Sequence, residues 1–95
     1  MITTNVPWLE AELLEESKFF SSVTDKTIIT HSSREENGFF LNEVTVNGKA
    51  YGYADRHEYN GELEHKRYLR RYAKLALFLA LTDFTGEKSE WGALT

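Results

Sequence analysis

The sequence predicts an α+β domain in which two helices cover one face of a mostly antiparallel sheet. Three observations indicate this class. Residues 8–20 and 62–82 have apolar positions at helical spacing, and the segments between them alternate as strands do. Two Asn-Gly pairs, Asn37-Gly38 and Asn47-Gly48, have the composition of tight hairpin turns. The expected element order is β-α-β-β-β-α, which forms a two-layer sandwich.

The first two elements are a short strand and an acidic helix. Residues 1–6 are rich in Ile, Thr and Val and are expected to form an edge strand. Asn5 is expected to cap the helix over 8–20, with Pro7 in its first turn. This helix carries Leu9, Leu13 and Phe20 on one face and, mostly opposite them, Glu10, Glu12, Glu15 and Glu16. A solvated surface is the favoured interpretation of the acidic face, and a basic partner is the alternative.

Three strands are expected over 27–33, 39–46 and 49–54. In the middle strand Phe40, Asn42, Val44 and Val46 share one side. In the last strand we expect the small residues Ala50, Gly52 and Ala54 to face the helices, which leaves Tyr51 and Tyr53 on the partly exposed side. A bulge at Gly52 is the alternative. The whole order is reminiscent of a ferredoxin-like fold without its last strand.

The totals limit the classes of function. Ninety-five residues suit one domain, and a net charge of −4 argues against a nucleic-acid-binding role for the whole chain. The sequence contains no Cys, which excludes disulfides, zinc–thiolate sites and iron–sulfur ligation within it. No signal peptide is evident, and the longest apolar run, 75–81, is too short to span a bilayer. We therefore expect a cytoplasmic protein with no membrane partner.

The final helix begins with a basic stripe, because its cationic residues recur three and four positions apart. These residues are Lys66, Arg67, Arg70, Arg71 and Lys74. They are candidates for binding an anion, either RNA phosphate or an acidic small ligand. The alternative, which we favour, is a solvated helix face paired with Glu62, Glu64 and acidic residues of the sheet.

The same helix continues as an apolar run over 75–81 that has no polar face. A helix that is apolar on every side is usually buried on every side. One side can cover the sheet, and we expect the other to meet a following domain or a second copy of the chain. The candidate interface residues are Leu75, Phe78, Leu79 and Trp91.

The histidines do not form a catalytic or metal signature. His31 alone in a strand is expected to be a hydrogen-bonded structural residue, with a general base as the weaker alternative. His57 with Glu58, and His65 with Glu62 or Glu64, do not have the spacing that places two His one helical turn apart. We assign no catalytic, cofactor-binding or metal-binding residue in this chain.

The C-terminal residues resemble a known family. Thr85-Gly86, followed by Trp91-Gly92-Ala93-Leu94-Thr95, is similar to a segment of the oxygen-independent coproporphyrinogen III oxidase-like proteins, the coproporphyrinogen dehydrogenase subgroup of radical SAM enzymes. In that family a helix rich in Tyr and Leu ends in Thr-Gly, and Trp-Gly-x-Leu-Thr follows. The resemblance covers 68–95, and over 1–61 only the order of elements is compatible.

The resemblance implies an oxidoreductase of heme biosynthesis. It implies an iron–sulfur cluster held by a Cys-x-x-x-Cys-x-x-Cys motif, S-adenosylmethionine, and oxidative decarboxylation of porphyrinogen propionates by a 5′-deoxyadenosyl radical. Because this chain has no Cys, no catalytic residue carries over. We expect 1–95 to be a non-catalytic N-terminal domain, with 83–95 beginning the linker to a catalytic domain of the same chain. The alternatives are a stand-alone binding module using 66–74 and a small homodimeric scaffold.

Overall fold

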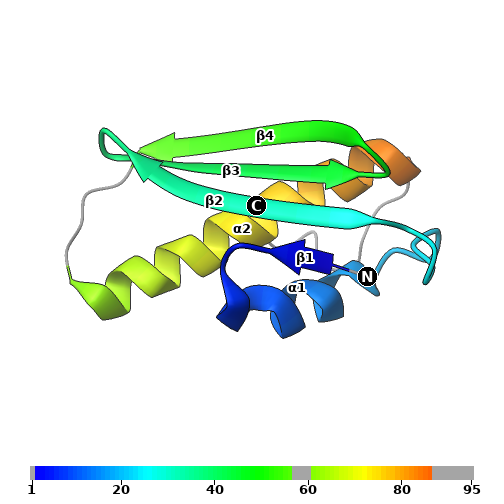
Figure 1. The fold of residues 1–95 in the computed structure, drawn as a ribbon, viewed down its shortest axis with the longest axis horizontal. Coiled ribbons are helices and arrows are strands. Elements are labelled where there is room, and N and C mark those ends of the chain that lie inside the picture. Colours follow the sequence, from blue (N-terminus) through cyan, green and yellow to red (C-terminus); the bar gives the residue numbers. More distant parts are fainter. Residues whose placement is uncertain (1, 57–60, 87–95) are drawn as a thin grey trace.

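The structure, a computed structural model, describes residues 2–56 and 61–86. It contains a four-stranded sheet and two helices, and one helix packs directly on the sheet (Figure 1). The elements, in chain order, are β1 (Ile2–Thr4), a 3-10 turn η1 (Pro7–Leu9), α1 (Glu10–Ser17), β2 (Ile29–Glu36), β3 (Phe39–Val46), β4 (Lys49–Arg56) and α2 (Glu62–Thr85). The predicted α+β class and the β-α-β-β-β-α order are confirmed.

The strands follow the order of the chain across the sheet, β1-β2-β3-β4. β1 pairs with β2 in parallel, and the other pairs are antiparallel. Asn37 and Asn47 take the positive φ values of 52° and 51° that both two-residue turns require. In the split β-α-β unit of a ferredoxin-like fold, another strand lies between the two parallel strands. Here β1 lies directly beside β2, with no strand between them. The predicted likeness to a ferredoxin-like fold was therefore wrong.

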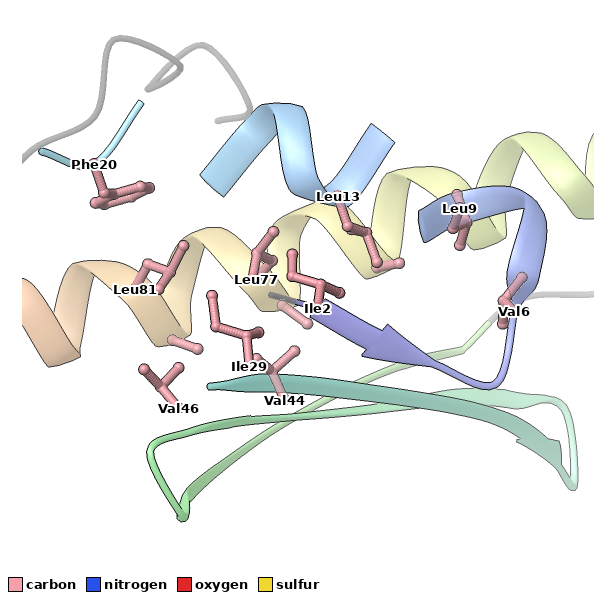
Figure 2. Close-up of a cluster of buried hydrophobic side chains, with 13 residues drawn as sticks. Ile2, Val6, Leu9, Leu13, Phe20, Ile29, Val44, Val46, Leu77 and Leu81 are labelled. Carbon is pink, nitrogen blue, oxygen red and sulfur yellow. The ribbon is translucent and has the colours of Figure 1, made fainter. Parts of the chain in front are cut away.

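The core lies between the sheet and the two helices. Figure 2 shows Leu9 from η1, Leu13 from α1, and Leu77 and Leu81 from α2. They form one cluster with apolar side chains of the sheet. Each of these four leucines is at most 1% exposed. Burying one such side chain contributes about 1.5–3 kcal/mol, so this layer is the main source of stability.

The face of β4 that was predicted to meet the helices is the wrong one. Tyr51 lies opposite the buried Val44, and in an antiparallel pair residues directly opposite share a face. Tyr51 and Tyr53 therefore pack against the core, while Ala50, Gly52 and Ala54 are exposed on the open face. The unbroken register between β3 and β4 also excludes a bulge at Gly52.

Several element boundaries differ from those expected. Asn5 does not cap the first helix. Its side-chain amide instead donates to the backbone oxygen of Ser33 and accepts from its N–H, each at 2.8 Å, which extends the contact between β1 and β2. At the other end, α2 continues through Thr85, three residues beyond the expected end of the helix at 82. Gly86, with a φ of 70°, ends it.

Candidate functional site

The basic stripe of α2 divides into two sides. Lys66, Arg70 and Lys74, four positions apart, form the side that faces α1. Nε of Arg70 lies 3.0 Å from the carboxylate of Glu12, and Nζ of Lys74 lies 3.4 Å from that of Glu16 and 3.7 Å from that of Glu12. Three of the five candidate anion-binding residues therefore face acidic and aromatic side chains of their own chain.

Trp8 completes this contact between the helices. The charged groups of Lys66 and Arg70 lie 5.8 Å and 5.3 Å from the centre of its ring, within the range of cation–π attraction. The stripe therefore pairs with acidic residues, but these are Glu12 and Glu16 of α1, where we expected Glu62, Glu64 and acidic residues of the sheet. Each exposed pair contributes about 0.2–1 kcal/mol, so its main effect is to orient α1 on α2.

Arg67 and Arg71 form the other side of the stripe. Arg67 is exposed and lines a shallow hollow with Glu62 and Glu64 at the start of α2. Arg71 is exposed near Tyr53 and Tyr72. Burial, followed by the nearby Asp55 carboxylate, raises the pKa of both tyrosines, and the guanidinium of Arg71 opposes this change. These two arginines are the part of the stripe available to an external anion.

The predicted interface residues of α2 have different environments. Phe78 is half-buried and packs on Phe20, with ring centres 6.1 Å apart. Leu75 is half-buried, and Leu79 is 45% exposed. Trp91 lies outside the described residues. The remaining residues of the run, Ala76, Leu77, Ala80 and Leu81, are buried by the same chain. The part of this run that remains exposed to solvent, and that could contact another protein surface, is thus centred on Leu79 and Leu75.

His31 is held in a buried polar network. Its Nδ1 lies 2.7 Å from Oγ1 of Thr4, and its Nε2 lies 2.9 Å from Oδ1 of Asn42. The backbone N–H of Val6 donates to the same Thr4 hydroxyl. Burial lowers the pKa of His31, and the hydrogen bond that its Nε2–H donates to Asn42 opposes this only in part. Both ring nitrogens are engaged inside the core, so the side chain fixes β1 on the sheet and is not accessible to a substrate as a general base.

The other predicted histidine positions give no assembled metal site in the part of the chain described. Nδ1 of His65 lies 3.6 Å from the carboxylate of Glu35, and its ring packs on Phe40 at 5.1 Å. Among residues 2–56 and 61–86 no three metal-ligating side chains converge. His57 and Glu58 lie outside those ranges.

One feature of the open sheet face escaped the sequence prediction. A hollow of about 550 Å³ lies over the middle of the sheet, and its lining includes Ser32, Arg34, Leu41, Glu43, Gly52 and Ala54. Its lining combines small residues of β2 and β4 with longer side chains of β2 and β3, and no helix covers this face in the described structure (Figure 1). The alternation of Ala50, Gly52 and Ala54 was the available signal, but it was assigned to the opposite face.

Comparison with known proteins identifies no relative: no family model, no curated protein and no solved structure matches this chain. Neither of the described helices has the length and hydropathy needed to cross a membrane.

Proposed function

We propose that this chain is the N-terminal α+β domain of a coproporphyrinogen III oxidase-like radical SAM enzyme, in which it supplies contacts and not chemistry. The observation that carries the proposal is the resemblance of 68–95, with Thr85-Gly86 and the Trp91–Thr95 segment, to that family. The structure supports it at one point. α2 ends at Thr85, and Gly86 takes the left-handed conformation with a φ of 70°, at the Thr-Gly pair where the family's helix ends.

In the proposed enzyme the chemistry belongs to the catalytic domain, and this chain supplies contacts to it. The expected reaction needs an iron–sulfur cluster held by Cys thiolates, and this sequence has no Cys. The cluster, S-adenosylmethionine and the porphyrinogen therefore belong to the catalytic domain. We also propose a cytoplasmic location, which the absence of Cys favours.

The second half of α2 is the surface proposed to dock on the catalytic domain. Leu79 is 45% exposed and Phe84 is 39% exposed, and both lie on the last three turns of the helix. Exposed apolar side chains grouped on one element favour contact with another protein surface. This contact would continue along the chain into the Trp91–Thr95 segment.

The reading frame downstream of Thr95 tests the proposal directly. We expect a Cys-x-x-x-Cys-x-x-Cys motif within roughly two hundred further residues, about one additional domain. A reading frame that stops soon after Thr95, or that continues without this motif, would refute the proposal.

A pair of substitutions in the extended protein tests the docking surface. Leu79→Asp is expected to expose the linker to protease and to lower enzyme activity, because it puts a charge into the contact. Leu63→Asp is the matched control, since Leu63 is 76% exposed at the start of the same helix. Equal effects of the two substitutions would show that α2 does not dock through Leu79.

A stand-alone anion-binding module is the alternative, and Arg67 and Arg71 are the residues it would use. Binding through phosphates weakens steeply as salt rises. A filter-binding titration with RNA at low and moderate salt should then show affinity that Arg67→Gln with Arg71→Gln reduces. Absence of binding at low salt removes this alternative.

A further inference from the structure

We propose that two copies of this chain pair along β4 and join their sheets across a two-fold axis at Gly52. The sheet order places β4 at one edge, and no strand within residues 2–56 and 61–86 pairs with its outer side. An open edge strand of eight residues is a ready template for a second strand. Its charged residues, Lys49, Asp55 and Arg56, lie at its ends.

The sequence of β4 is its own complement in an antiparallel pair. From Ala50 to Ala54 it reads Ala-Tyr-Gly-Tyr-Ala, the same in both directions, and it is flanked by Lys49 and Asp55. With Gly52 opposite Gly52 of the second copy, each Tyr51 lies opposite a Tyr53 and each Lys49 opposite an Asp55. Cross-strand aromatic pairs and opposite charges both favour this register. The two ends of the pair carry the same charge contact.

The backbone groups of β4 that point away from β3 are those that an antiparallel pair centred on Gly52 requires. The two-residue turn makes Val46 and Lys49 a hydrogen-bonded pair, and such pairs alternate along an antiparallel ladder. The N–H and C=O groups of Ala50, Gly52 and Ala54 therefore point away from β3, toward the outer edge. A two-fold pair centred on Gly52 uses these groups, and it forms about six backbone hydrogen bonds.

Neither steric space nor backbone conformation requires glycine at position 52 within the described part of a single copy. Glycine in a strand interior costs stability, and it often marks a place where another backbone comes close. The φ of Gly52 lies outside the left-handed region, and a Cβ built there would meet nothing within 4 Å. The register with β3 is also unbroken at this residue. On the two-fold axis Gly52 lies directly opposite its own counterpart, which is the close approach of a second backbone that glycine in a strand often marks.

The same pairing covers the exposed flank of α2. Two residues on one row of that helix contact β4: the ring of Tyr72 lies 6.2 Å from that of Tyr53, and Asp83 lies 3.4 Å from Nζ of Lys49. Leu75 and Leu79 lie between them on this row, at spacings of three and four residues, and therefore next to the sheet edge.

The joined sheet brings both copies of α2 to the same face. Because α2 packs beneath both β3 and β4, the two helix axes lie about two strand spacings apart, roughly 10 Å. This is the distance at which helices pack. In the isolated domain a second copy thus covers Leu75 and Leu79, the surface that we propose docks on the catalytic domain in the longer protein.

Single cysteines test the register, because the natural chain contains none. In the pair, Gly52→Cys faces its own counterpart with Cα atoms about 5.5 Å apart, within reach of a disulfide. Ala50→Cys and Ala54→Cys are each displaced from their own counterparts by four residues, roughly 13 Å, which is too far. Under mild oxidation Gly52→Cys should cross-link at least tenfold faster than either, and a mixture of the other two should give the mixed dimer. Equal rates at the three positions would overturn the proposal.

Charge reversal provides the second test, measured by sedimentation over a wide concentration range. Lys49→Asp should weaken dimerisation at least tenfold, and adding Asp55→Lys should restore it. Asp83→Asn is the matched control, because it removes the internal contact of Lys49 and should leave the dimer intact. A strictly monomeric natural chain at every concentration, or a double reversal that fails to restore association, contradicts pairing along β4.

Discussion

Replacing Leu77 by alanine is the substitution that tests how α2 lies on the sheet. Leu77 is 1% exposed and lies at the centre of the core, close to Ile2 and Ile29 in Figure 2. Leu79, two positions further along the same apolar run, is 45% exposed. The sequence presents the two residues as equivalent, whereas the structure makes one a core residue and the other a surface residue.

The expected magnitude follows from this burial. Leu77→Ala removes roughly three buried methylene equivalents at about 0.8 kcal/mol each, and the cavity adds to this loss. We expect the free energy of unfolding to fall by about 3 kcal/mol. For 95 residues the total is about 5–14 kcal/mol, so the loss is a large fraction of it. Leu79→Ala should change it by less than about 0.5 kcal/mol, as surface substitutions do.

Urea unfolding followed by far-ultraviolet circular dichroism measures both variants. The experiment is done in dilute solution, so that association through Leu79 does not contribute. Equal destabilisation by the two substitutions, or a larger effect at Leu79, would refute the orientation of α2. Such a result would mean that the helix is rotated about its axis, so that a different set of residues faces the sheet.

Three further predictions concern the helix contact, the buried histidine and the glycines. A double-mutant cycle with Glu12→Ala and Arg70→Ala should give a coupling of about 0.5 kcal/mol in urea unfolding, because the pair is partly exposed, and zero coupling at low salt would contradict the contact. Burial lowers the pKa of His31 below its ordinary 6.5, so the unfolded chain takes up the proton first, and the stability present above pH 6.5 is lost as pH falls through the lowered pKa. Between about pH 7.5 and about pH 5.5, His31→Gln should therefore lose less stability than the natural protein, and equal losses would be evidence against the buried neutral ring. Gly48→Ala should cost about 1 kcal/mol because its φ is +88°, whereas Gly52→Ala should be neutral or stabilising in the monomer, and thermal unfolding that reverses this order would contradict the turn geometry.

The hairpins were predictable because their signals are local. Asn47-Gly48 supplies the two positive-φ residues of a tight turn, and the alternation from Phe40 to Val46 indicates which side of β3 is buried. Together these features specify the register of β3 against β4. The class of fold and the order of the elements followed from such signals.

The face of β4 could not be predicted from β4 alone. Alternation separates Tyr51 and Tyr53 from Ala50, Gly52 and Ala54, but it does not say which set meets the helices. That choice is made by pairing with β3, whose buried Val44 lies opposite Tyr51. The tyrosines then fill the space beside α2 near the edge of the sheet.

Partners distant in the chain were the other limit. Arg70 and Glu12 are 58 positions apart, and neither the spacing of the basic stripe nor that of the acidic helix indicates that they meet. The hydrogen bonds of His31 to Thr4 and Asn42 likewise depend on β1 lying parallel to β2, which brings Thr4 beside His31. Such contacts are consequences of the assembled fold, and short-range patterns carry no information about them.

The native polypeptide, purified without oxygen from its source through an antibody to this domain, shows whether the domain belongs to a radical SAM enzyme. The measurement combines its mass and iron content with its cleavage of S-adenosylmethionine to 5′-deoxyadenosine. We expect a polypeptide well above 11.0 kDa that contains iron and carries out this cleavage. An iron-free polypeptide of 11.0 kDa without this activity would contradict it.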